Sequence, residues 1–230
     1  MFVPEIFVNL ALPMREGKAR MTRRSASDKE YFFQDWIEMQ LGGAYGIHRQ
    51  GRNSHPDYIL TKDGLSVGLE AKSLENRQAN RRDPSVAPCR TDVDFNSAIP
   101  CGFINFRNQT LRCYYAFALY DTDSSSTLHV NGICVAFVDG NYLNRDFNLA
   151  VSHRNVSKGG FGSYGDGFIR TRKMYRFPNP LTYEPFRYKS VFVTEDKIVN
   201  PRVHGLKQTI IVTKTGKDGV EYVFNVYELA

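Results

Sequence analysis

The chain has 230 residues, of which 42% are hydrophobic and 13% aromatic, and this composition excludes an intrinsically disordered protein. Its 30 lysine and arginine residues exceed its 24 acidic residues, so the net charge of +6 favours a polyanionic partner. No apolar stretch approaches the length of a membrane span, so we expect no membrane partner. One α/β or α+β domain over residues 1–230 is the simplest organisation for this length.

Residues 1–14 are apolar in places, but prolines and polar residues interrupt the run. Because the run also lacks a basic start, we do not expect a signal peptide. Four cysteines are scattered without a C-x-x-C pair, which favours free thiols in a reducing cytoplasm over a zinc site. They are Cys89, Cys101, Cys113 and Cys134.

A helix is predicted to begin near Ser27, because Ser27 and Glu30 have the spacing of a capping box. Apolar residues then recur at intervals of three and four, which is the period of a helix with one buried face. These residues are Phe33, Trp36, Ile37 and Leu41. The consecutive glycines at 42 and 43 are expected to end the helix.

Asp63 and Gly64 predict a two-residue type I′ turn, because Asp tolerates and Gly supplies the positive φ that this turn requires. Pairing outward from the turn places Asp57 opposite Glu70. Strand side chains alternate between faces, so one face of the hairpin is apolar and is expected to face the core. It carries Tyr58, Leu60, Leu65, Val67, Leu69 and Ala71. A slip of one residue would expose this set to water, which supports the register.

The other face carries the carboxylates of Asp57 and Glu70 and the ammonium group of Lys72, with Ile59 as its one apolar residue. Opposed residues have Cβ atoms about 4.5–5.5 Å apart. Two carboxylates at that separation repel unless one holds its proton or a cation lies between them. Mg²⁺ binds oxygen ligands and usually keeps several waters, so it suits such a pair. The alternative is a surface hairpin in which Lys72 only neutralises Glu70.

Further strands are predicted at residues 111–120 and 128–138, which are apolar and β-rich and are expected to extend the sheet. Residues 209–213 and 220–229 flank a Lys-Asp-Gly turn and predict a closing hairpin.

Basic residues gather near the start of the chain, after the hairpin, and around a glycine-dense loop at residues 159–167. Each group alone fits a solvated surface, but three groups around a cation site favour phosphate contacts. The glycine-dense loop is able to approach a DNA backbone closely. The expected DNA contacts are Arg77, Arg81, Arg82, Arg154, Lys158, Arg170, Arg172 and Lys173.

The order Pro56-Asp57 followed by Glu70-Ala71-Lys72 resembles the PD-(D/E)xK nuclease signature, in the variant found in type II restriction endonucleases. The resemblance covers only this short part of the chain. It implies that Asp57, Glu70 and the backbone carbonyl of Ala71 hold Mg²⁺, and that Lys72 orients the attacking water. It also implies a restriction-endonuclease-like fold, with a mixed central sheet flanked by helices.

Members of this family often place a glutamate on the helix before the Pro-Asp strand, where it aids positioning of the metal or the water. Glu30 is the first candidate for this catalytic role and Glu38 the second. The capping box offers a different explanation for Glu30.

The resemblance implies a type II restriction endonuclease that hydrolyses double-stranded DNA at specific sequences and leaves 5′-phosphate and 3′-hydroxyl ends. It further implies a homodimer in the cytoplasm of a prokaryote, accompanied by a protective methyltransferase. One alternative is a structure-specific repair or recombination nuclease, such as a resolvase, with the same fold. Another is a basic DNA-binding protein without catalysis, although the intact Asp57, Glu70 and Lys72 argue against it.

Overall fold

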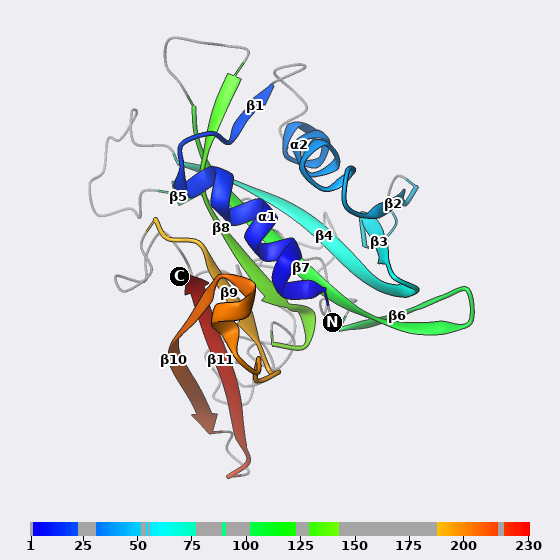
Figure 1. Ribbon diagram of the computed structural model, residues 1–230, viewed down its shortest axis with the longest axis vertical. Coiled ribbons are helices and arrows are strands. Elements are labelled where there is room, and N and C mark those ends of the chain that lie inside the picture. Colours follow the sequence, from blue (N-terminus) through cyan, green and yellow to red (C-terminus); the bar gives the residue numbers. More distant parts are fainter. Residues whose placement is uncertain are drawn as a thin grey trace, which may run out of the picture.

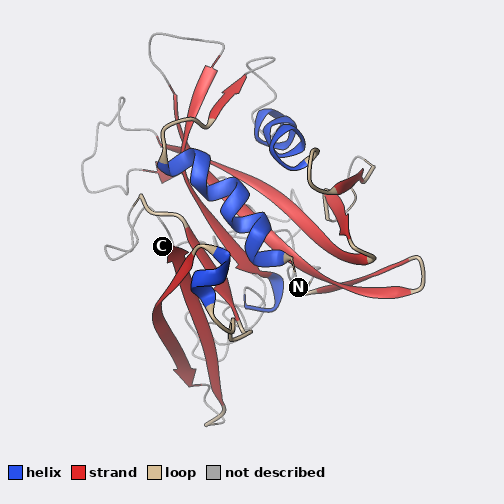
Figure 2. Cartoon of the chain, in the orientation of Figure 1, coloured by secondary structure: helices blue, strands red, loops and turns tan. Residues whose placement is uncertain are grey.

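The computed structural model describes residues 2–22, 31–51, 54, 56–76, 89–90, 102–122, 129–142, 188–215 and 219–230. Figures 1 and 2 show a strand-rich structure in which helices lie across one mixed sheet. The helices are α1 (Val3–Arg15) and α2 (Tyr31–Leu41), and a short 3-10 helix, η4, spans Pro201–His204. This arrangement confirms the expected α+β class.

The central path of the sheet has the order β10-β11-β9-β8-β7-β4-β3-β2. The strands on this path are β10 (Leu206–Thr215), β11 (Glu221–Leu229), β9 (Val191–Thr194), β8 (His129–Asp139), β7 (Gln109–Thr122), β4 (Leu65–Asn76), β3 (Tyr58–Lys62) and β2 (Gly46–Arg49). Three short strands, β1 (Arg20–Thr22), β5 (Cys89–Arg90) and β6 (Phe103–Phe106), pair with β8, β4 and β7. The pairs β4–β7 and β8–β9 are parallel, which makes the sheet mixed.

The predicted hairpin is formed by β3 and β4 in the predicted register, with Tyr58 opposite Leu69 and Lys62 opposite Leu65. Asp63 and Gly64 both have positive φ, at 50° and 75°, as a type I′ turn requires. The turn chemistry therefore sets the register of every pair that follows it.

One face of the hairpin packs beneath the helices, as expected, through Tyr58, Leu60, Val67, Leu69 and Ala71. The prediction was wrong for Leu65, which lies beside the turn at the tip of the hairpin and is 53% exposed. The opposite face is also withdrawn from water, since Ile59 and Glu70 are both buried. The interpretation as a simple surface hairpin therefore does not hold at Glu70.

Helix α1 was not anticipated from the sequence. Its apolar side chains recur at helical spacing and are buried over the sheet: Val3, Ile6, Phe7, Leu10, Ala11 and Met14. The ring of Phe7 stacks on Phe192 and lies near Phe137. Pro4 is tolerated in the first turn, where its missing N–H has no helical acceptor to lose.

Helix α2 confirms the predicted helix and its end. Phe33, Trp36, Ile37 and Leu41 are all buried, and the N–H of Gly42 donates to the carbonyl of Glu38 at the last turn. The predicted cap at residues 27–30 lies outside the described residues.

The expected strands at 111–120 and 128–138 are confirmed as parts of β7 and β8, and the C-terminal hairpin as β10 and β11. Cys113 and Cys134 are free thiols in the core. Among the described residues, no helix is both long and apolar enough to cross a bilayer.

Replacement of Gly64 by alanine tests the turn. An added Cβ meets no atom within 4 Å, so the substitution acts only through the φ of 75°. We expect a loss of about 1–2 kcal/mol in the free energy of unfolding, measured by urea denaturation. Gly43→Ala is the matched control, because its Cβ also meets nothing and its φ is not positive; this variant should be neutral or slightly stabilised. Equal effects of the two substitutions would contradict the assigned turn.

Candidate active site

Asp57 and Glu70 lie opposite each other at the point where the β3–β4 ladder ends. The backbone N–H of Asp57 donates to Oε2 of Glu70 at 3.0 Å, and the backbone N–H of Ala71 donates to Oδ2 of Asp57 at 2.7 Å. The carbonyl of Asp57 accepts the N–H of Gln50 at 2.8 Å on its other side. Side chains thus continue the pairing beyond Tyr58, and they fix both carboxylates in the predicted arrangement.

Lys72 lies beside Glu70, with its Nζ 2.6 Å from Oε1 of that carboxylate. The side chain of Lys72 is 19% exposed, whereas that of Glu70 is 2% exposed. The ammonium group therefore stands between a buried carboxylate and the solvent. The structure brings together Asp57, Glu70, Ala71 and Lys72, as the sequence predicted.

Gly68 allows Pro56 and Asp57 to lie this close to β4. A Cβ at position 68 would come within 2.4 Å of Sγ of Cys113 and 2.9 Å of Cγ of Pro56. Cys113 is the partner of Gly68 on the parallel strand β7. The absent side chain thus leaves room both for the neighbouring strand and for the residue that precedes Asp57.

Gln34 on α2 contacts Oδ1 of Asp57. Gln34 was not among the site residues expected from the sequence. Its Nε2 donates to Oδ1 of Asp57 at 3.0 Å, and its Oε1 accepts a hydrogen bond from Arg49 at 2.9 Å. In the sequence Gln34 stands four residues after Glu30 and four before Glu38, and in α2 it shares one side of the helix with Glu38. This spacing of four is the signal in the sequence that points to Gln34, but an uncharged glutamine does not stand out as a metal ligand.

Neither glutamate candidate is shown at Asp57. Glu30 lies outside the described residues. Glu38 accepts a hydrogen bond from Arg49 at 3.1 Å. Burial raises the pKa of the Tyr58 phenol well above its usual value, and the neighbouring carboxylate of Glu38 raises it further, so Tyr58 is neutral here.

The donor set fits a hard divalent cation. Asp57 and Glu70 offer carboxylate oxygens, and Ala71 offers a backbone carbonyl beside them. A carboxylate has about four lone-pair sites, so its hydrogen bonds leave it able to accept a cation as well. Within the described ranges, no group of three or more His, Cys, Asp or Glu side chains is placed to hold a metal. Two carboxylates, a main-chain oxygen and water remain as ligands, and this set suits Mg²⁺.

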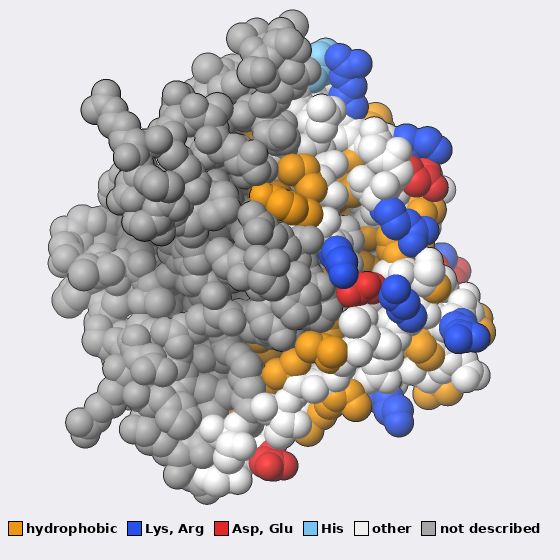
Figure 3. All heavy atoms as spheres, turned by 90° about the vertical axis from the view of Figure 1, so that its left-hand side faces the viewer, with side chains coloured by type: hydrophobic (Ala, Val, Ile, Leu, Met, Phe, Trp, Pro, Cys, Tyr) orange, Lys and Arg blue, Asp and Glu red, His pale blue; other side chains and the backbone are white. Residues whose placement is uncertain are grey.

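The eight residues expected to contact DNA lie outside the described residues: Arg77, Arg81, Arg82, Arg154, Lys158, Arg170, Arg172 and Lys173. Of the basic residues near the start of the chain, Arg15 donates to the carbonyl of Ala230 and Lys18 pairs with Glu16. In the described part of one side of the molecule, Lys and Arg side chains are spread among hydrophobic ones (Figure 3).

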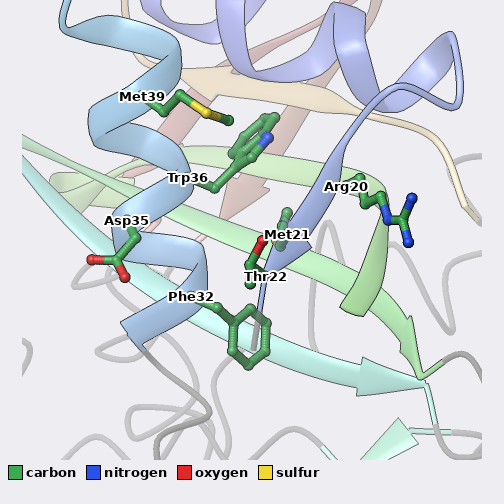
Figure 4. A pocket seen from close by; sticks show the side chains of 7 residues that line it. All are labelled: Arg20, Met21, Thr22, Phe32, Asp35, Trp36 and Met39. Atoms are coloured by element: carbon green, nitrogen blue, oxygen red, sulfur yellow. The ribbon is translucent and has the colours of Figure 1, made fainter. Parts of the chain in front are cut away.

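A separate pocket of about 370 Å³ lies between β1 and α2 (Figure 4). It is lined by Arg20, Met21, Thr22, Phe32, Asp35, Trp36 and Met39. On a helix with 3.6 residues per turn, the α2 residues of this pocket project from the side opposite to Gln34. The pocket is therefore distinct from the carboxylate site.

No known protein family matches the chain, and no curated protein or solved structure is significantly similar to it. The local geometry and its chemistry are therefore the basis for a functional assignment.

Gly68→Ala tests the close packing that places Asp57. We expect a loss of about 1–3 kcal/mol in the free energy of unfolding, because both atoms close to the new Cβ belong to packed neighbours. Gly51→Ala is the control, since its Cβ would make only an ordinary 3.6 Å contact with Ser54. In a Cys113→Ala background the cost should fall but not vanish, because Pro56 still opposes the new group. A Gly68→Ala variant as stable as Gly51→Ala would refute this packing.

Proposed function

We propose that this protein is a Mg²⁺-dependent endonuclease of the type II restriction kind, which hydrolyses phosphodiester bonds in double-stranded DNA. One observation carries the proposal. A single hairpin holds Asp57 opposite Glu70 and places the Lys72 ammonium 2.6 Å from Glu70. Two carboxylates can bind a divalent cation and an adjacent ammonium can orient a water or a phosphate oxygen, so together they suit metal-assisted phosphodiester hydrolysis.

The wider structure supports this proposal. Helix α2 precedes the Pro56-Asp57 segment and contacts it through Gln34, and the sheet around the hairpin is mixed. Both features are consistent with a restriction-endonuclease-like core. The net charge of +6 suits a nucleic acid. The proposal includes a homodimer that acts on palindromic DNA in a prokaryotic cytoplasm.

In the proposed mechanism, Asp57, Glu70 and the carbonyl of Ala71 would hold Mg²⁺. The bound ion would lower the pKa of water and offset charge that develops on the phosphate. Lys72, an ammonium group paired with Glu70, would help to orient the attacking water and a phosphate oxygen, because an ammonium group carries three N–H donors. The water oxygen forms a bond to phosphorus as it gives up a proton to bulk water, the bond from phosphorus to O3′ breaks, and the 3′ oxygen takes up a proton from bulk water. The products are 5′-phosphate and 3′-hydroxyl ends.

The decisive experiment incubates the purified full chain and Mg²⁺ with diverse unmethylated linear DNA, and with a four-way junction. We expect discrete fragments that share one sequence at their ends. Cleavage of the junction alone would identify a resolvase-like nuclease, and binding without cleavage would identify a non-catalytic DNA-binding protein.

Single substitutions Asp57→Ala, Glu70→Ala and Lys72→Ala should each lower the cleavage rate by about 10²-fold or more, because each removes a group required at the phosphate. Glu16 and Lys18 provide a matched control. They form the same pair two residues apart at 2.8 Å, but on the surface. Glu16→Ala and Lys18→Ala should cleave at the wild-type rate. If Asp57→Ala and Lys72→Ala cut as fast as these controls, the proposed site is wrong.

A further inference from the structure

The side-chain amide of Gln34 has only one orientation that satisfies both of its neighbours. Arg49 carries N–H donors and no acceptor, so the group that faces it must be the amide oxygen. The amide NH₂ must then face Oδ1 of Asp57, where it donates at 3.0 Å. Gln34 is only 8% exposed, so it is held within packed surroundings.

Arg49 also lies close to two carboxylates of α2. One of its terminal nitrogens lies 3.1 Å from Oε1 of Glu38 and 3.8 Å from Oδ1 of Asp35. The helix consequently presents a neutral donor to Asp57 through Gln34, while Glu38 balances the charge of Arg49.

This arrangement limits how many cations the site can hold. The hydrogens of an amide NH₂ carry positive charge and repel a cation that approaches from the Oδ1 side of Asp57. The Oδ2 side faces β4, where Ala71 and Glu70 lie. Two-metal sites hold their ions about 3.5–4 Å apart and need anionic ligands for both. The NH₂ group of Gln34 lies against Oδ1 of Asp57, and it cannot act as a ligand there because it is a hydrogen-bond donor only.

We propose that Gln34, oriented by Arg49, is a positioning residue that fixes the Asp57 carboxylate and restricts the site to one divalent cation. The proposal rests on the function proposed above, and it concerns the number of ions and the residue that sets it.

The test counts bound Mn²⁺ on the full chain in the absence of DNA, by electron paramagnetic resonance of the free ion. We expect one bound ion per wild-type chain and its loss in Asp57→Ala. Gln34→Glu replaces the NH₂ group with a carboxylate oxygen, so we expect a second bound ion or binding at least about tenfold tighter. Gln40→Glu is the matched control, because it adds the same charge to the same helix on another side; it should behave as wild type.

Arg49 is tested by a second pair of variants. Arg49→Ala removes the donor that orients the amide, so the Mn²⁺ affinity of the single site should change several-fold. Arg49→Lys keeps a donor and should restore the wild-type value in part, while thermal unfolding reports any general loss of structure.

The outcomes separate the two proposals. Two ions on the wild-type chain, or identical binding by wild type, Gln34→Glu and Gln40→Glu, would overturn the role of Gln34 alone. If no Mn²⁺ binds to wild type, or if Asp57→Ala binds as wild type does, the proposed metal-dependent function fails.

Discussion

A buried carboxylate must find its partners inside the protein, and Glu70 imposes this requirement on the structure around it. Removing a charge from water costs several kcal/mol unless ion pairs and hydrogen bonds replace the lost hydration. Lys72 and the backbone N–H of Asp57 supply those partners. Because Asp57 must lie within hydrogen-bond distance of β4, position 68 has room for no side chain. The Asp63–Gly64 turn, the register of the hairpin and Gly68 therefore all help to place Asp57 where its N–H can stabilise the buried carboxylate of Glu70.

The same requirement extends to parts of the chain that are distant in sequence. Asp57 receives hydrogen bonds from β4 through Ala71 and from α2 through Gln34, and its carbonyl receives one from the segment that follows β2. Arg49 connects β2 to α2 through Gln34 and Glu38. Helix α2, strand β4 and the segment that follows β2 thus meet at Asp57, and their hydrogen bonds hold its carboxylate and its backbone carbonyl in place.

The β3–β4 hairpin was predictable because its determinants are local. A positive-φ turn and strict alternation of side chains fix the register without knowledge of the rest of the fold. Leu65 was predicted wrongly because the alternation of side chains shows which face a residue is on, but not where along the strand the helices stop covering that face. The burial of Glu70 was not predictable, since it depends on what packs against the second face of the sheet.

Helix α1 and the contact of α2 with Asp57 were harder to predict from the sequence. In α1, Asn9 and Pro13 looked like interruptions, although the apolar spacing from Val3 to Met14 is helical. Gln34 carries no charge, so nothing in the sequence marked it, and its contact with Asp57 depends on how α2 packs against the sheet. The roles of Glu30 and of the eight expected DNA-contacting residues stay predictions, because those residues lie outside the described part of the chain.

The two neighbours of β4 differ in how far away they lie along the chain. Its partner β3 is reached across a two-residue turn, whereas the parallel partner β7 begins only at Gln109. Hairpins form in microseconds, but parallel pairing must first close a long loop and is slower. We therefore expect Asp57 and Glu70 to come together during folding before β7 joins the sheet beside them. In that order, the acidic pair would assemble while water still screens its repulsion, and the later docking of β7 would complete the sheet around it.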